Sequence, residues 1–155
     1  MASPSRSRCR EWALQLLYQA EFAGHQDGEV IRFWRYFHRG DQVPAYLNQL
    51  VAGVTAHQEE LDGLIRKYSE HWRLERMAAV DRNLLRLAMF ELLHCPEIPA
   101  KVVINEAVEL AKRYGSELSG AFVNGILDRM YQALRQTQEK TQEEPSSREE
   151  DTHGL

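Results

Sequence analysis

Apolar residues recur every three to four positions along most of this chain, and no segment shows the strict apolar–polar alternation of a half-buried strand. Residues 101–115, KVVINEAVELAKRYG, are one example, with a single apolar side made of Val103, Ala107, Leu110 and Tyr114. Gly115 is expected to cap this helix at its C-terminus. Helices of this kind bury their apolar sides against one another, so the sequence predicts an all-α fold, a compact helical domain of six to seven helices.

The first predicted helix, residues 6–23, is apolar on most of its surface. Its polar side is a narrow stripe made of Arg8, Glu11, Gln15 and Gln19. A helix with so little polar surface either packs on several sides or packs on one side and offers another to a partner. Further helices are expected at residues 30–40, 43–68 and 101–114, from Asp81 up to Pro96, and from Ser119 onward.

Local signals predict where some of these helices begin. Asp81 is expected to be an N-cap, with Val80 and Leu85 forming a hydrophobic staple across the first turn. Ser119 is expected to cap the last helix, and Pro44 suits the first turn of the 43–68 helix. The aromatic residues of the 30–40 helix are expected in the core: Phe33, Trp34 and Phe37.

The charge of the chain is unevenly distributed. The formal net charge is −4, and residues 136–155 alone account for it, with six acids against two bases. Residues 1–135 are therefore neutral, and an anionic partner stays possible despite the acidic total. The sequence predicts a helical domain over residues 1–135 and an acidic, disordered tail over residues 136–155, which lack apolar periodicity.

Several classes of function lack support in the sequence. There is no Gly-rich nucleotide loop of the Walker or GxGxxG type. His94 and Cys95 are adjacent at a helix end and point in different directions, so they make an unsuitable nucleophile–base pair. With no CxxC or HxxxH spacing, we expect no metal site, no cofactor and no catalytic site. No apolar run is long enough to span a membrane, so a cytoplasmic location is the default expectation.

Two places could bind a nucleic acid. The chain starts with Arg6, Arg8 and Arg10, whose planar guanidinium groups suit phosphate, although the same residues could be a disordered basic end. Phe122 lies between Gly120 and Gly125. Glycine destabilises a helix, so two glycines here are explained if another backbone or a ligand must come close. Phe122 could therefore be an exposed platform for stacking a base, or it could belong to the core.

Four segments together resemble the NusB family of bacterial transcription antitermination factors: CREWALQLLY, DRNLLRLAMFELL, IPAKVVINEAVELAKRYG and FVNGILDRM. The pattern INEAVELAK…FVNG is the most specific of them, and the resemblance covers roughly residues 5–134. It implies an all-helical protein built as two packed three-helix-type halves, without enzymatic activity or cofactor. It also implies binding of boxA-type RNA together with NusE, a small ribosomal-subunit protein, in a complex with RNA polymerase that acts on ribosomal RNA operons.

The resemblance also implies particular site residues. The expected RNA contacts are Arg6, Arg8, Arg10, Tyr68, Arg86, Lys112, Ser116, Ser119 and Phe122. The expected NusE contacts are Tyr18, on the first helix, and Asp81, whose carboxylate would pair with a basic partner. The N-cap and partner roles of Asp81 are compatible.

These contacts predict modest RNA affinity. Three arginines that contact the phosphates of a single strand would make log RNA affinity fall with log salt concentration at a slope of about 2, because each phosphate contact contributes roughly 0.7. One base stacked on Phe122 would contribute about 1–3 kcal/mol. We therefore expect weak binding of RNA alone and tighter binding with NusE. Two alternatives stay open: a detached RNA-binding module of a ribosomal RNA methyltransferase system, and a helical protein that dimerises through its first helix.

Overall fold

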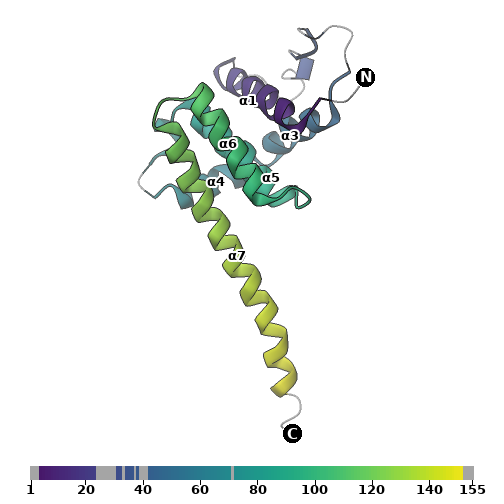
Figure 1. The fold of residues 1–155 in the computed structure, drawn as a ribbon, viewed down its shortest axis with the longest axis vertical. Helices are drawn as coiled ribbons and strands as arrows, with labels where there is room; N and C mark the ends of the chain where they lie inside the picture. The colour runs from purple at the N-terminus through teal and green to yellow at the C-terminus, as the bar shows by residue number, and fades with distance from the viewer. Residues whose placement is uncertain are drawn as a thin grey trace.

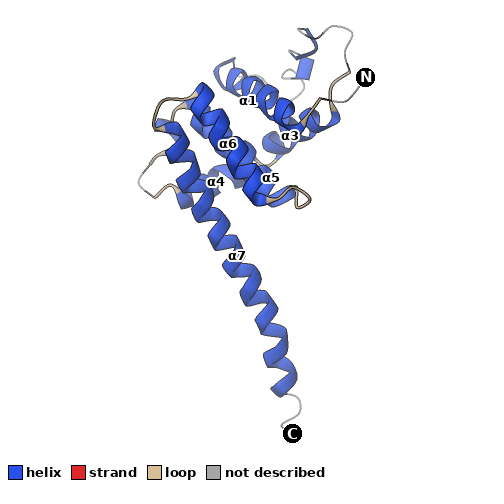
Figure 2. Ribbon diagram, in the orientation of Figure 1, coloured by secondary structure: helices blue, strands red, loops and turns tan. Residues whose placement is uncertain are grey.

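The computed structural model describes residues 4–23, 31–32, 34–36, 38, 42–70 and 72–151, with side chains up to Thr141. Its helices are α1 (Arg6–Ala23), α3 (Ala45–Ala56), α4 (Gln58–Tyr68), the 3-10 helix η1 (Leu74–Arg76), α5 (Ala79–His94), α6 (Ala100–Tyr114) and α7 (Ser119–Asp151). Every regular element in these ranges is a helix (Figure 2). The all-α prediction is confirmed, and α1 spans the predicted residues.

Helix α5 is the centre of the fold. It contacts α1, α3, α4, α6 and α7, while α1 also packs on α3 and α6 packs on α7 (Figure 1). Every residue from Asn83 to Glu91 is buried, so even the charged positions of this helix lie inside. Buried charges need partners because desolvation is costly. The pairing of these charges therefore decides which side chains are available for binding.

The predicted 43–68 helix is two helices, because the chain breaks at His57 (φ −108°, ψ 18°) between α3 and α4. Pro44 is the N-cap of α3 and lies just before the first turn in which it was expected. Gly53, one turn before the break, contacts the Phe90 ring so closely that a Cβ at this position would collide with it. Glycine thus lets α3 approach α5 at this point.

Both predicted N-caps are wrong. Helix α5 begins three residues earlier than expected, with Ala78 instead of Asp81 as N-cap, and the Ala78 carbonyl accepts a hydrogen bond from Arg82 N–H. Asp81 is therefore inside the first turn, and the staple across it does not apply. Ser119 is the first residue of α7, whose first backbone hydrogen bond runs to Leu118; its hydroxyl instead accepts a hydrogen bond from Ser116 N–H.

Gly115 is the C-cap of α6, as predicted, but its φ of −97° is open to any residue. Its backbone lies against the Ser119 side chain and the Ala111 carbonyl, which leave no room for a Cβ. A close approach, not a left-handed conformation, explains the glycine.

The expected disordered tail begins inside a helix. Helix α7 continues through residue 136 to Asp151 and projects beyond the other helices (Figure 1). The first residues of this segment are mostly Gln, Glu and Lys, which favour helix, and the Thr137 and Thr141 hydroxyls donate to carbonyls one turn back. Acidic composition without an apolar side therefore did not prevent a helix here. The division into domains at residue 135 stays a prediction.

Among the aromatic residues expected in the core, Trp34 is buried and packs edge-to-face with Trp12, at 5.6 Å between ring centroids. Phe33 and Phe37 lie outside the described residues. Over the described ranges, no helix has the length and apolar character needed to cross a membrane.

Candidate nucleic-acid and partner interface

The three N-terminal arginines lie within α1 and do not form a separate arm. Arg10 is buried, and its guanidinium donates two hydrogen bonds to Glu91, at 2.7 and 2.8 Å, and one to Glu106 at 3.2 Å. Burial disfavours the charge, but the hydrogen bonds and charge of Glu91 outweigh it and raise the pKa of Arg10. Arg10 therefore joins α1 to α5 and α6 as a structural residue, and its guanidinium is not presented to RNA.

Tyr46 completes this buried cluster. Its hydroxyl donates to the second oxygen of Glu91, and burial together with Glu91 raises the pKa of the phenol far above its usual range. Glu91, only 1% exposed, thus has both oxygens engaged, as a buried carboxylate requires.

Arg6 and Arg8 lie on the outside of the same helix. The Arg8 side chain is 59% exposed, 3.7 Å from Glu11, and its guanidinium carbon lies 5.4 Å from the centre of the Trp12 ring. The Arg6 guanidinium is 5.5 Å from the Tyr46 ring. These two cations remain accessible to phosphate groups.

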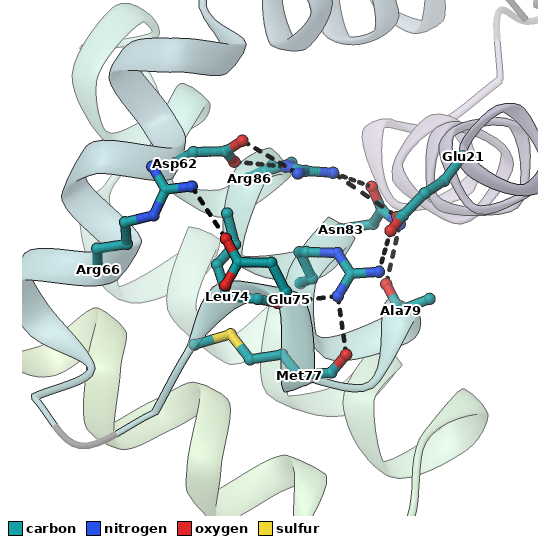
Figure 3. A network of polar contacts seen from close by, with 10 residues as sticks. Glu21, Asp62, Arg66, Leu74, Glu75, Met77, Ala79, Asn83 and Arg86 are labelled. Carbon is teal, nitrogen blue, oxygen red and sulfur yellow. Dashed lines mark hydrogen bonds and ion pairs between the residues drawn. The ribbon is translucent and has the colours of Figure 1, made fainter. Parts of the chain in front are cut away.

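Arg86 was also expected to contact RNA, but it is buried on α5. Its guanidinium donates to both oxygens of Asp62, at 2.7 and 3.1 Å, and to the Asn83 side chain at 3.2 Å (Figure 3). The opposite side of the same group faces Glu21 at 3.7 Å. Arg86 therefore links α4 and α1 through α5, and its hydrogen-bonding capacity is used inside the protein.

Glu21 is held by further donors in this network (Figure 3). Asn83 donates to it at 2.8 Å, and Arg82 donates to it while also donating to the carbonyls of Leu74 and Met77, at 2.9 and 2.8 Å. Burial, together with the charge of Arg86, lowers the pKa of Arg82. The network fixes η1 and the end of α1 against α5.

An open surface lies at the start of α7, made of Trp72, Phe122, Gly125 and Arg129; we call it the α7-start surface. Phe122 is half-buried and packs edge-to-face with Trp72, at 5.5 Å between ring centroids, while Trp72 is 58% exposed. Gly125 and Arg129 continue the same side of the helix, and only the Arg129 guanidinium lies near a Cβ built on Gly125, at 3.9 Å. The two glycines thus differ: Gly120 packs against α6, whereas Gly125 leaves open space beside Phe122.

Three other predicted RNA residues lie at the surface near the ends of helices. Tyr68, half-buried at the end of α4, has the Lys67 ammonium 5.4 Å from its ring centre. Lys112 is exposed on α6, pairs with Glu109 at 3.5 Å, and touches Gly120 of α7 through its stem. Ser116 is exposed in the loop between α6 and α7. Ser119, in contrast, is 2% exposed and holds the loop by its hydroxyl, so it does not present that group to RNA.

A separate apolar groove of about 630 Å³ runs along α1. It is lined by Leu14, Gln15, Tyr18, Gln19, Phe22, Val80 and Tyr114. Phe22 is 69% exposed and packs against Tyr18, at 4.9 Å between ring centroids. Exposed apolar surface of this kind is costly in water and is typical of a protein-binding surface. The α1 groove leaves Tyr18 accessible at the surface, and its contact with NusE stays a prediction.

Asp81 lies beside the groove residue Val80 but is 7% exposed. Within the described residues, its Oδ1 atom is buried without a hydrogen-bond partner. Burial raises the pKa of this carboxyl, and a contact with the Ser119 hydroxyl partly opposes the shift. As placed, Asp81 does not offer this oxygen to a partner.

His94 and Cys95 do not form a reactive pair. The Cys95 thiol is buried and accepts a hydrogen bond from Gln49 at 3.6 Å, and burial raises its pKa, which favours the unreactive thiol. His94 instead lies 3.8 Å from Glu60.

Residues 7–132 match the NusB family. A transcription antitermination protein NusB of Sorangium cellulosum is 51% identical over 131 residues, which cover 84% of this chain and 94% of that protein. A second, from Anaeromyxobacter dehalogenans, is 52% identical over 83% of this chain and 92% of its own length. The chain belongs to the NusB family of transcription antitermination proteins.

Solved structures of the NusB family share the fold. T. maritima NusB superimposes with a TM-score of 0.76 at 40% identity, over 83% of this chain and 91% of that one. A structure of the antitermination factors NusB and NusE in complex with double-stranded RNA superimposes with a TM-score of 0.73 at 32% identity, over 83% and 96%.

Trp72 and Phe22 are the candidate binding residues that sequence reasoning missed, even with the NusB family resemblance in hand. Each is a large apolar residue in a polar stretch, SEHWRLER and QAEFAGHQ. Trp72 stands alone among polar residues, with no apolar periodicity that would place it in the core, and this was the available signal. Phe22 follows Tyr18 at helical spacing, so nothing in the sequence separated it from the packed residues of that helix.

Proposed function

We propose that this protein is a transcription antitermination factor that binds boxA-type single-stranded RNA together with NusE, in a complex with RNA polymerase that acts on ribosomal RNA operons. Membership of the NusB family supports the general role. The structure of a relative with NusE and RNA supports the choice of partners. The proposal assigns RNA and NusE to different surfaces of this chain.

The observation that carries the RNA proposal is the exposed ring of Trp72 against Phe122 on the α7-start surface. Proteins recognise single-stranded RNA mainly by stacking unpaired bases on aromatic rings, with cations holding the phosphates. Trp72 and Phe122 supply the rings, and the open space above Gly125 would let a nucleotide approach the α7 backbone. Tyr68 and Ser116 would contact the same strand.

Arg6, Arg8 and Lys112 would supply phosphate contacts. Arg10 and Arg86 are excluded from direct contact because their guanidinium groups are bound to Glu91 and Asp62, and Ser119 would act only by shaping the loop. Only two arginines of α1 are accessible instead of three, so the contribution of these arginines to the salt dependence of RNA affinity falls to a log–log slope of about 1.4.

The α1 groove would bind NusE. Tyr18 and Phe22 offer exposed aromatic surface, and aromatic residues are enriched among those that dominate interface energies. Asp81 would contribute only indirectly, because it is buried next to the groove residue Val80; a large replacement such as Asp81→Arg would distort the groove.

Fluorescence anisotropy with labelled boxA RNA and a scrambled control tests the proposal, each with and without NusE. We expect weak, sequence-dependent binding by the chain alone and tighter binding with NusE. Phe22→Ala should abolish the gain from NusE and leave binding of RNA alone unchanged. Equal affinity for boxA and scrambled RNA under both conditions would contradict the proposal.

Exposed apolar surface on α1 could also mediate self-association, so light scattering belongs to the same experiment. A homodimer that dissociates when NusE is added would show that both use the α1 groove. A dimer that persists with NusE bound would place self-association elsewhere.

A further inference from the structure

Three potential metal ligands meet on the side of the molecule where α3 ends. His57 lies at the junction of α3 and α4, Glu60 in the first turn of α4, and His94 at the end of α5. One ligand atom from each lies within 4.8 Å of the other two. His57 Nδ1 is 3.4 Å from one Glu60 oxygen and His94 Nε2 is 3.8 Å from the other. Both imidazoles thus face one carboxylate.

The backbone brings these residues together. The Phe90 ring lies directly over Gly53, where no Cβ would fit, so α3 and α5 approach closely. His57 and His94 come one turn after these two residues, each four positions further on, and therefore lie side by side on the same faces. Their rings stack, at 4.2 Å between centroids. The chain break at His57 then turns α4 so that Glu60 lies beside both rings.

This set of donors suits a borderline transition-metal ion. Zn²⁺ binds imidazole nitrogen and carboxylate oxygen, and a tetrahedral site with metal–ligand bonds of about 2.1 Å separates its ligand atoms by about 3.4 Å. The pair formed by His57 and Glu60 already has this separation. The three side chains are 34–50% exposed, so small rotations can close the site without disturbing the core.

The local electrostatics are compatible with a cation. The C-termini of α3 and α5 both end at this cluster, and helix C-termini carry partial negative charge. The N-terminus of α4 adds partial positive charge, but the carboxylates of Glu59 and Glu60 in its first turn counter that charge.

We propose that His57, Glu60 and His94 form a binding site for a divalent transition-metal ion of the Zn²⁺ type, with water completing the coordination. Bound metal would join the α3–α4 junction to the end of α5 and stabilise that contact. The site is separate from the α1 groove and the α7-start surface, so it does not depend on the proposed RNA and NusE functions. The spacing of ligands in the sequence does not indicate this site, because its two histidines come from different helices.

Calorimetric titration of the metal-free full chain with Zn²⁺, and in parallel with Mg²⁺, tests the site. We expect one Zn²⁺ per chain, no comparable Mg²⁺ binding, and a rise in the unfolding temperature with Zn²⁺. Glu60→Gln and His94→Gln should each lower Zn²⁺ affinity by more than about tenfold, since even changes behind the ligands have effects of this size. Glu59→Gln, a neighbouring acid outside the cluster, should leave it unchanged.

X-ray absorption of the Zn²⁺-loaded chain should show two imidazole ligands, and circular dichroism should show that the variants fold. Zn²⁺ binding that is absent up to millimolar concentration would overturn the proposal. So would equal affinity in Glu60→Gln, His94→Gln and the wild type, since the ion would then bind elsewhere, at other histidines.

Discussion

The interior around α5 and the α7-start surface use their polar and aromatic side chains in opposite ways. Around α5, Arg10 and Arg86 are each less than a tenth exposed and each is bound by two oxygens of one carboxylate. At the start of α7, Trp72 is more than half exposed and packs edge-to-face with Phe122. A buried charge must have its partners inside the fold, whereas an exposed ring keeps a face available for another molecule. Burial thus separates structural residues from candidate binding residues better than residue type does.

The largest effect is expected from removing a buried cation. Arg10→Ala leaves Glu91 charged and buried without its partner, so the free energy of unfolding should fall by about 3–5 kcal/mol. Urea denaturation followed by circular dichroism measures it. The matched control is Arg8→Ala on the same helix, which should change stability by less than about 0.5 kcal/mol. Equal, small losses for both would remove the distinction drawn between the two arginines.

Trp72→Ala should separate binding from stability. Because one stacked base contributes about 1–3 kcal/mol, boxA affinity should fall by roughly 5-fold to 150-fold. The unfolding temperature should change little, since the ring is mostly outside the core. Anisotropy titration and thermal unfolding of the same sample check both. A stability loss without an affinity loss would make Trp72 a packing residue.

Asp81 gives a pH-dependent test of the cost of a buried carboxylate with one unsatisfied oxygen. Its pKa in the folded state is raised above the ordinary value of 3.8, so its protonated form favours folding, and that stability is lost as the pH rises through the folded-state pKa. Asp81→Asn removes the charge and should raise the free energy of unfolding by about 1–3 kcal/mol at pH 7. The difference from wild type should shrink toward zero below pH 3.8. A gain that is the same at every pH would show that charge is not its cause.

The smallest effect tests the open space on α7. Gly125→Ala should stabilise the helix by up to about 1 kcal/mol and at the same time weaken boxA binding, because the methyl group occupies the space beside Phe122. Gly63→Ala is the control, as no atom lies within 4 Å of a Cβ built there. Gly63→Ala should stabilise α4 by a similar amount and leave RNA affinity unchanged. Unchanged RNA affinity in both variants would show that the RNA does not pass close to Gly125.

The all-α fold and the extent of α1 could be predicted from the sequence because helical periodicity is a local property of the chain. The N-cap assigned to Asp81 failed at the same local level, since Ala78, a residue without a capping side chain, starts the helix. Composition did not indicate the helical backbone of residues 136–151, whose first residues are mostly good helix formers; the disorder predicted for this tail stays a prediction.

The role of the arginines could not be predicted, because it depends on contacts between distant residues. Arg10 is bound by Glu91, 81 positions away, and Arg86 by Asp62, 24 positions away. No rule based on the spacing of residues in the sequence predicts such pairs. The same holds for His57 and His94, which meet only because Gly53 lets α3 approach α5. An exposed candidate such as Trp72 is easier to find in principle, because an isolated aromatic residue in a polar stretch is visible in the sequence.

Tryptophan fluorescence during a boxA titration tests most directly whether RNA binds at the α7-start surface. Trp34 is buried and Trp12 half-buried, so Trp72 is the exposed reporter among the tryptophans. With excitation at the red edge of the tryptophan absorption band, we predict quenching that saturates with binding in the wild type. Trp72→Phe, which keeps a ring for stacking, should still bind but lose the quenching. Identical quenching in the two proteins would contradict the account.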